Sequence, residues 1–177
     1  MNKNIIHIAL TIVATATLLS LDGCRRQPPV IEPNTKTDNG YSEHLANANK
    51  YIAQAEATSI QAYIARRNWP MTQMANGAWI WVYEQGNGRI VNADDSVTVS
   101  YRMEAVNGAT IYEKVTDTLV AGHRQTMVGL DDALLGLPRG SKLRLALPSS
   151  LGYGIAGDGD RVPQSAILII DAKIHQQ

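Results

Sequence analysis

The sequence predicts an α+β fold, in which an antiparallel sheet wraps around one short helix and follows an N-terminal amphipathic helix. Residues 41–67 contain neither Gly nor Pro, and apolar or small residues recur there every three or four positions, as on one face of a helix. After Gly77 the apolar period changes to two, and Gly-containing turn signals separate the alternating segments. Several strands around a single helix define an α+β domain.

The N-terminal helix is expected within residues 41–70. Arg66 and Arg67 suit the negative end of the helix dipole, and Pro70 ends the helix because the residue before a proline avoids the helical conformation. We expect one narrow stripe of this helix to be buried, either against its own domain or against a second copy in a homodimer. The stripe consists of Tyr41, Leu45, Ala48, Ile52, Ala55, Ser59 and Tyr63.

Strands are expected where apolar residues alternate between turn signals. The Asn107-Gly108 dipeptide predicts a hairpin, and the continuous apolar character of the last strand predicts a central place in the sheet. A short helix is expected over residues 131–137, because acidic residues open it and Pro138 closes it. The predicted strands cover residues 79–83, 96–103, 143–147 and 166–174.

Residues 1–23 have the pattern of a bacterial lipoprotein signal peptide. Lys3 gives a positive start, residues 5–21 are mostly apolar, and a small residue precedes the single cysteine, Cys24. This arrangement is similar to a lipobox, whose cysteine is lipidated and holds the protein at a membrane, here expected to face the periplasm. A transmembrane anchor and an ordinary cleaved signal are the alternatives. Residues 24–40 are rich in proline and are expected to form an extended tether.

The composition argues against several functional classes. The chain has 16 basic and 16 acidic residues, so it lacks the charge of a nucleic-acid-binding protein, and no nucleic-acid partner is expected. One cysteine permits neither an internal disulfide nor a zinc–thiolate site. His44, His123 and His175 are scattered without metal-ligand spacing, and neither a metal nor another cofactor is expected.

Four motifs follow one another in a characteristic order from residue 81 onward. Together they resemble the FK506-binding protein (FKBP) type of peptidyl-prolyl cis-trans isomerase, and the resemblance implies an FKBP-like domain over residues 71–177. The added helix and the lipobox look like the lipoprotein subset associated with gliding motility in Bacteroidota. The motifs are residues 81–88, 95–101, 129–134 and 147–168, with LeuProSerSerLeuGlyTyrGly at 147–154 the most specific part.

The resemblance implies an enzyme that rotates X–Pro bonds and so assists the folding of extracytoplasmic proteins. Rotation breaks amide resonance, and the uncatalysed event takes tens to hundreds of seconds. No nucleophile, acid or metal is needed, because a dry, apolar pocket that favours the twisted amide and donates hydrogen bonds to substrate carbonyls is sufficient. The partners implied are proline-containing polypeptide clients.

The resemblance also assigns roles to particular residues. Tyr101 and Tyr153 match two tyrosines at the pocket rim, and Tyr153 is expected to donate its hydroxyl to a substrate carbonyl. Tyr112 stands where the family normally has an Asp after the first Phe. The substrate-binding positions implied are Met127, Thr126, Leu130, Ile111, Tyr112, Val162 and Ile170.

This chain departs from the family where the pocket is built, and it contains no Phe at all. Leu130 replaces a Trp of the pocket floor, Ile111 and Ile170 replace Phe, and a third Phe position falls near Asp117. Aliphatic replacements keep a pocket apolar but remove its rigid aromatic walls. Three alternatives therefore stay open: an active isomerase, a weakly active or inactive binding and chaperone protein, and a structural lipoprotein that keeps only the fold.

Overall fold

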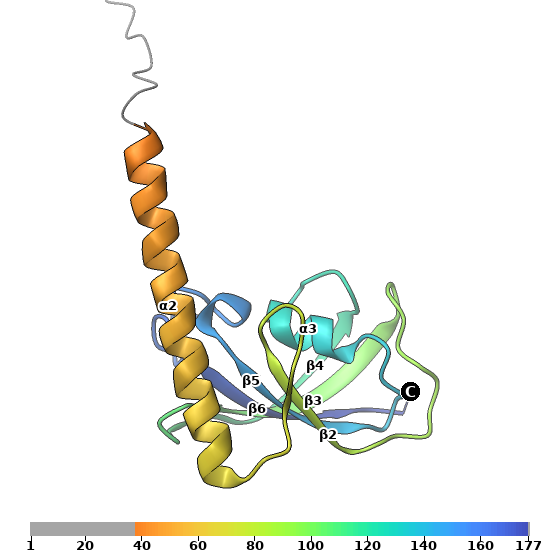
Figure 1. Ribbon diagram of the computed structural model, residues 1–177. Helices are drawn as coiled ribbons and strands as arrows, with labels where there is room; N and C mark the ends of the chain where they lie inside the picture. The colour runs from red at the N-terminus through yellow and green to blue at the C-terminus, as the bar shows by residue number, and fades with distance from the viewer. Residues whose placement is uncertain (1–37, 177) are drawn as a thin grey trace, which may run out of the picture. The chain divides into compact units, whose positions relative to one another are not determined.

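The computed structural model describes residues 38–176, with side chains described from Ser42 onward (Figure 1). The expected signal peptide, Cys24 and most of the expected tether lie outside the described residues. Residues 42–176 belong to one structural unit. Among the described residues, no helix combines the length and the hydrophobicity that a membrane span requires.

Six strands form one antiparallel sheet in the spatial order β1-β2-β5-β6-β3-β4. β6 lies between β5 and β3, as the continuous apolar character of the last strand predicted. With its short helix and its N-terminal helix, the molecule confirms the predicted α+β fold. The strands are β1 (Thr72–Gln73), β2 (Trp79–Glu84), β3 (Ser96–Ala105), β4 (Thr110–Val120), β5 (Lys142–Leu147) and β6 (Leu168–Ile174).

Within residues 38–176, the α-helices α2 (Asp38–Arg67) and α3 (Val128–Leu134) pack against opposite faces of this sheet (Figure 1). On β6, Ile170 belongs to the buried cluster that includes α3, whereas Ile169 belongs to the cluster that includes Ile60 of α2. Neighbouring residues of a strand point to opposite faces. The sheet therefore separates a larger core beneath α3 from a smaller core beneath α2.

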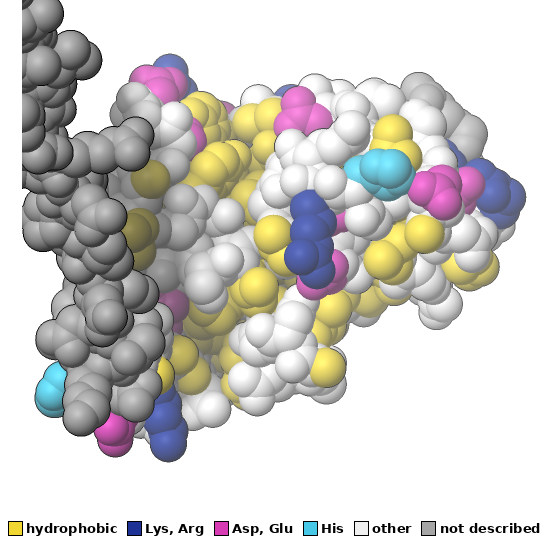
Figure 2. Space-filling model, turned by 90° about the horizontal axis from the view of Figure 1, so that it is seen from above, with side chains coloured by type: hydrophobic (Ala, Val, Ile, Leu, Met, Phe, Trp, Pro, Cys, Tyr) yellow, Lys and Arg dark blue, Asp and Glu magenta, His cyan; other side chains and the backbone are white. Residues whose placement is uncertain are grey.

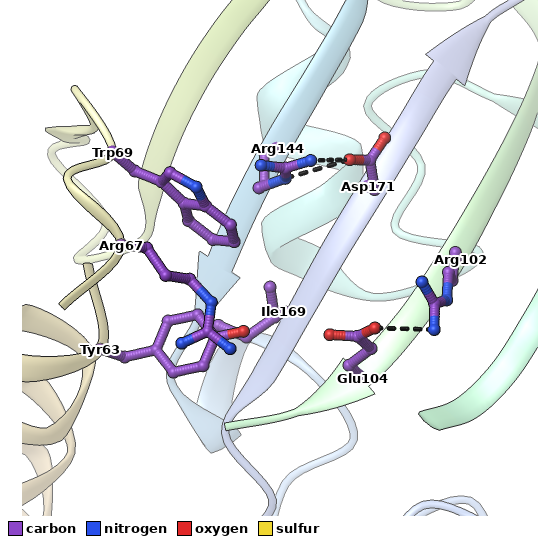
Figure 3. A pocket seen from close by; sticks show the side chains of 8 residues that line it. All are labelled: Tyr63, Arg67, Trp69, Arg102, Glu104, Arg144, Ile169 and Asp171. Carbon is purple, nitrogen blue, oxygen red and sulfur yellow. Dashed lines mark hydrogen bonds and ion pairs between the residues drawn. The ribbon is translucent and has the colours of Figure 1, made fainter. Parts of the chain in front are cut away.

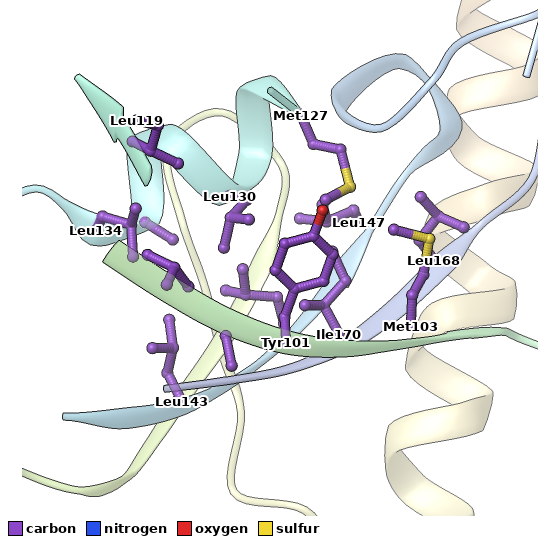
Figure 4. Close-up of a cluster of buried hydrophobic side chains, with 14 of the residues drawn as sticks. Tyr101, Met103, Leu119, Met127, Leu130, Leu134, Leu143, Leu147, Leu168 and Ile170 are labelled. Atoms are coloured by element: carbon purple, nitrogen blue, oxygen red, sulfur yellow. The ribbon is translucent and has the colours of Figure 1, made fainter. Parts of the chain in front are cut away.

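The larger core is built from the inward-facing residues of the central strands and from α3 (Figure 4). Leu143, Leu145 and Leu147 alternate along β5 and are all fully buried. Leu130 and Leu134 close the core from the α3 side, and both have no exposed surface. Burying a leucine side chain contributes roughly 1.5–3 kcal/mol, so this core fixes α3 and the loops on either side of it.

The buried face of α2 differs from the predicted stripe. Tyr63 is buried as expected, but Leu45 and Ile52 keep 48% and 49% of their surface exposed. From Ser42 onward, only the last three turns of α2 carry side chains buried against the sheet domain. The alanines of the stripe carry too little apolar surface to select a face. The buried residues of α2 are Glu56, Ile60, Tyr63 and Ile64.

The short helix α3 starts at Val128 and ends at Leu134, whereas the sequence predicted residues 131–137. Asp131 therefore lies inside the helix and is fully buried. Its carboxylate accepts the backbone N–H groups of Gly122 at 3.0 Å and Arg124 at 2.7 Å. The acidic residue that seemed to open the helix instead holds the loop that leads into it.

Basic and acidic side chains are interspersed on the face seen from above in Figure 2. Among the described residues, basic and acidic side chains form pairs, such as Arg89 with Asp95 and Lys142 with Glu84, each at 2.7 Å. This mixed distribution follows from the equal numbers of basic and acidic residues in the chain. Surface pairs of this kind contribute little to stability.

Candidate functional site

A cavity of about 380 Å³ opens on the α3 side of the sheet, between β3, β4 and the loops around α3. β3 supplies Tyr101, β4 supplies Asp117, and the turn after η1 (Ser149–Leu151) supplies Tyr153. Its volume lies within the range of small-ligand sites. The lining residues are Tyr101, Asp117, Thr118, Leu119, Gln125, Thr126 and Tyr153.

Tyr101 lies with its ring in the core and its hydroxyl at the cavity. Only 5% of the residue is exposed, and the ring extends from β3 toward Met127 at the start of α3 (Figure 4). The hydroxyl donates a hydrogen bond to Asp117 Oδ2 at 3.0 Å. Burial, followed by the negative charge of Asp117, raises the pKa of Tyr101 far above its ordinary value. Tyr101 therefore keeps its proton at neutral pH and points it at Asp117.

Tyr153 occupies a tight turn whose backbone is fixed on both sides. The carbonyl oxygen of Ser149 accepts the N–H groups of Gly152 at 3.0 Å and Gly154 at 2.8 Å. Gly154 has φ +64°, a conformation that favours glycine. Burial raises the pKa of Tyr153, and the charges of Asp158 and Asp117 raise it further. The Tyr153 hydroxyl thus remains protonated and can donate a hydrogen bond at the cavity that it lines together with Tyr101.

A buried glutamate of α2 holds the same turn. Glu56 Oε1 accepts the hydroxyl of Ser149 at 2.6 Å, and Glu56 Oε2 accepts the Ser149 backbone N–H at 3.0 Å. Both residues are buried, and hydrogen bonds to an ionised acceptor are roughly twice as strong as neutral ones. One carboxylate therefore connects α2 to the residue whose carbonyl fixes the turn that carries Tyr153.

A second tyrosine–carboxylate pair orders the loop of residues 157–163. The Tyr112 hydroxyl donates to Asp158 Oδ2 at 2.6 Å, while Asp158 Oδ1 accepts the N–H groups of Asp160, Arg161 and Val162 at 2.7–2.9 Å. The hydrogen bond from Tyr112 is the largest cause that lowers the pKa of Asp158 to about 2. The same hydrogen bond, with burial and the charge of Asp158, raises the pKa of Tyr112 to about 12.

Comparison with known protein families identifies the family to which a chain with this arrangement of residues belongs. The family model described as "FKBP-type peptidyl-prolyl cis-trans isomerase" matches residues 87–175. The chain belongs to this family. The matched segment contains every residue that lines the cavity, and the class of enzyme, a peptidyl-prolyl cis-trans isomerase, is the one that the sequence predicted.

Curated relatives in the FKBP family align with about half of this chain. An FK506-binding protein of Neisseria meningitidis serogroup A is 30% identical over 96 residues, which cover 51% of this chain and 87% of the relative. The peptidyl-prolyl cis-trans isomerase FKBP15-1 of Arabidopsis thaliana is 33% identical over 85 residues, which cover 45% of this chain and 55% of the relative.

A solved structure shares the FKBP fold. The peptidyl-prolyl cis-trans isomerase of Pseudomonas syringae pv. tomato superposes with a TM-score of 0.58 at 24% identity, over 71% of this chain and 92% of that protein. At this level of identity the likeness concerns the fold alone. It includes the antiparallel sheet and short helix on which the cavity is built.

Among the site residues predicted from the FKBP resemblance, Tyr101, Tyr153 and Thr126 line the cavity together. Five of the other predicted binding residues are buried, and Leu130 and Ile170 have no exposed surface to offer a ligand. Tyr112 lies outside the lining and organises a neighbouring loop instead. The predicted residues in the core are Met127, Leu130, Ile111, Val162 and Ile170.

The cavity wall is also more polar than the predicted apolar pocket. Asp117, Thr118 and Gln125 line it beside the tyrosines, and FKBP sequence motifs alone did not place them there. Asp117 lies between the matched motifs and outside every predicted strand, so the family resemblance assigned it no binding role. Among the described residues, no group of three His, Cys, Asp or Glu side chains is arranged to hold a metal ion.

Proposed function

We propose that this protein catalyses the cis–trans isomerisation of X–Pro bonds in polypeptides at the cavity between Tyr101 and Tyr153. The observation that carries the proposal is the pair of protonated tyrosine hydroxyls at one cavity, each with its own support. Asp117 orients Tyr101, and the Ser149 carbonyl with Glu56 behind it orients the turn of Tyr153. Preorganised donors cost no reorganisation when the reacting amide twists.

The chemistry requires stabilisation of one twisted amide. Rotation about an amide passes a barrier of about 18–20 kcal/mol because resonance holds the bond planar. Each tenfold acceleration needs about 1.4 kcal/mol of preference for the twisted form. The Tyr153 hydroxyl donates to the substrate carbonyl next to the proline, while Leu119 and the tyrosine rings provide the apolar part of the wall for the prolyl ring.

Tyr101 has a different role from Tyr153. Its proton is directed to Asp117, so its oxygen acts as an acceptor, for the neighbouring Thr126 or for a substrate N–H. Asp117 brings a carboxylate to the wall of the cavity. A prolyl ring bound beside this carboxylate would remove water from it, which costs free energy. This cost favours a slow isomerase over a fast one.

Binding of proline-containing segments without turnover is the second candidate function. It is favoured by the complete burial of Leu130 and Ile170, since the cavity then lacks a rigid hydrophobic floor at these positions. The two functions differ in one measurable respect. A binding protein slows or leaves unchanged the isomerisation of a bound chain, whereas an isomerase accelerates it at substoichiometric amounts.

The decisive experiment follows the slow, proline-limited phase of refolding of a test protein with catalytic amounts of this chain. Wild type is expected to accelerate the phase, and Tyr153→Phe about fivefold to tenfold less, because one hydrogen bond of about 1–1.4 kcal/mol is lost. Tyr51→Phe is the matched control, since Tyr51 is 74% exposed on α2. Absence of acceleration by wild type at any concentration contradicts the isomerase, and equal rates for all three proteins contradict the role of Tyr153.

The proposal also covers the cellular location of the protein, its clients and its oligomeric state. The protein is proposed to act outside the cytoplasm on folding clients, lipid-anchored through Cys24, as a member of the gliding-motility-associated subset of Bacteroidota. The lipobox and the added helix support this placement. A homodimer through α2 is supported by the exposed apolar side chains of Leu45, Tyr51 and Ile52, and the sedimentation coefficient of the full chain tests it.

A further inference from the structure

A second cavity, of about 370 Å³, lies on the α2 side of the sheet (Figure 3). Its residues on β3 and β6 alternate with those of the larger core, so it faces away from the cavity of Tyr101. Tyr63 and Trp69, at the end of α2 and just beyond it, form one wall, and Ile169 forms part of the floor. The size falls within the range of small-ligand sites.

The charged groups around this cavity leave one positive charge without a carboxylate. Arg144 donates to Asp171 through Nε at 3.0 Å and also through Nη2. Arg102 pairs with Glu104 at 2.9 Å. The third arginine of the cavity, Arg67, has no carboxylate partner among residues 42–176. Arg102 also pairs with Glu113 at 3.3 Å, but Glu113 is largely exposed and lies outside the cavity lining. Among the lining residues, three arginines and two acids leave a surplus of one positive charge.

Arg67 is held in place by an aromatic ring instead of an acid. Its guanidinium carbon lies 3.7 Å from the centre of the Tyr63 ring and 5.5 Å from that of Trp69. Stacking uses the face of the guanidinium group, whereas its N–H donors lie in the plane and point outward. The edge of Arg67 therefore remains available for a planar, bidentate partner.

The Tyr63 hydroxyl supplies a second donor with nothing to bind. Tyr63 is 1% exposed, and its hydroxyl has no hydrogen-bond partner within the described part of the chain. Figure 3 shows this oxygen beside Ile169, in the cavity beneath Arg67. A buried polar group without a partner costs about 1–3 kcal/mol, and native structures contain few of them.

We propose that this cavity binds the carboxylate of an acidic side chain, Asp or Glu, in an extended polypeptide segment. Arg67 and the Tyr63 hydroxyl donate to the carboxylate, and Trp69 and Ile169 cover its aliphatic stem. A single negative charge balances the surplus positive charge, whereas a phosphate dianion would leave excess negative charge beside Glu104 and Asp171. The inference rests on the proposed function only in taking polypeptide clients as the ligand, and it gives the client a second contact on the α2 side.

Calorimetric titration of the full chain with proline-free, acetylated and amidated peptides tests the proposal. One peptide carries a central Glu among Ala and Leu, and its twin carries Gln. The Glu peptide is expected to bind about tenfold tighter or more, because hydrogen bonds to a charged acceptor are lost in the twin. Arg67→Gln is expected to abolish the difference, whereas Arg66→Gln, which removes the same charge from a residue outside the cavity, keeps it.

The variant Tyr63→Phe distinguishes an effect on peptide binding from an effect on protein stability. Loss of an unpartnered hydroxyl leaves the melting temperature unchanged or raises it, while the affinity for the Glu peptide falls severalfold. Equal affinities for the Glu and Gln peptides, or equal losses in Arg67→Gln and Arg66→Gln, overturn the proposal, as does tighter binding of inorganic phosphate than of the Glu peptide. Arg67→Gln is expected to isomerise a short peptide without acidic residues as fast as wild type. A failure of the carboxylate-binding proposal can therefore be distinguished from a failure of the proposed isomerase site.

Discussion

At the scale of single residues, two tyrosine–carboxylate pairs organise the cavity and the loop beside it. Tyr101 donates to Asp117 at the cavity, and Tyr112 donates to Asp158 in the adjacent loop. The position after Ile111 is normally an Asp in the family and is Tyr112 here. Both carboxylates of these pairs, Asp117 and Asp158, lie on residues to which the family resemblance assigned no binding role.

Tyr112→Phe is expected to make the stability of the protein less dependent on pH under acidic conditions. The pKa of Asp158 is lowered to about 2 in the folded protein, against about 3.9 in an unfolded chain. A lowered carboxyl pKa stabilises the fold above the unfolded value, and this contribution is lost as the pH falls from about 5 toward 2. The variant lacks the largest cause of the shift, so it loses less stability over this range.

Urea unfolding of wild type and Tyr112→Phe between pH 2 and 7 measures this effect. The difference between the two proteins should be largest above pH 5 and should shrink toward pH 2, where Asp158 is protonated in the unfolded chain and half-protonated in the fold. Tyr51→Phe, at an exposed position, serves as control. A difference that stays constant with pH would exclude the Asp158 pair as its origin.

At the scale of secondary-structure elements, α2 belongs to the site although none of its residues lines the prolyl cavity. Glu56 reaches Ser149 across 93 positions of sequence. The Ser149 carbonyl in turn holds the two glycines that flank Tyr153. Through this connection the added helix supports the orientation of a proposed catalytic hydroxyl.

Glu56→Gln is expected to lower both stability and isomerase activity. The amide of Gln presents a donor group to one of the two Ser149 donors, so about 1–3 kcal/mol of unfolding free energy is lost. Loss of this hydrogen bond also leaves Tyr153 less well positioned. The value of kcat/KM should therefore fall severalfold even at temperatures where the variant is fully folded. Urea unfolding and the refolding assay measure the two effects.

Glu43→Gln, at an exposed position of the same helix, is the matched control for charge and helix propensity. A double-mutant cycle of Glu56→Gln with Ser149→Ala should yield a coupling free energy of about 1 kcal/mol or more. Zero coupling, or an unchanged kcat/KM in the folded variant, would remove Glu56 from the support of Tyr153.

The burial of α2 is tested by two isoleucines of the same helix. Ile60 is fully buried against the sheet, whereas Ile52 keeps 49% of its surface exposed. Ile60→Ala should cost about 2–5 kcal/mol of unfolding free energy, and Ile52→Ala about 0.5 kcal/mol or less. Equal costs, measured by urea unfolding, would mean that α2 buries a different face.

The elements predicted from the sequence are those with strong local signals. Alternating apolar residues marked β2, β3, β5 and β6, and the motifs around Tyr101 and Tyr153 placed both tyrosines at one site. β4 lies at the edge of the sheet, and most of its side chains are exposed or half-buried, so its residues carry no clear apolar period. The face of α2 and the Glu56–Ser149 pair depend on contacts distant in sequence, which no local pattern encodes.

At the scale of the whole molecule, the proposed lipid anchor at Cys24 decides where the isomerase acts. Cys24→Ser removes the only thiol of the chain and with it the proposed acylation site. In detergent phase separation of cell extracts, wild type is expected in the detergent phase and the variant in the aqueous phase, because acyl chains supply the membrane affinity. Retention of the variant in the detergent phase would favour a transmembrane anchor instead.

The positions of the tryptophans also determine which part of the protein contributes its tryptophan fluorescence. All three tryptophans of the chain, Trp69, Trp79 and Trp81, pack on the α2 side of the sheet, and Leu130 stands where the family places a Trp beneath the proline. Intrinsic tryptophan fluorescence therefore reports on the α2 face and leaves the prolyl cavity without a tryptophan reporter. Replacing Leu130 with Trp would install an optical probe under the site.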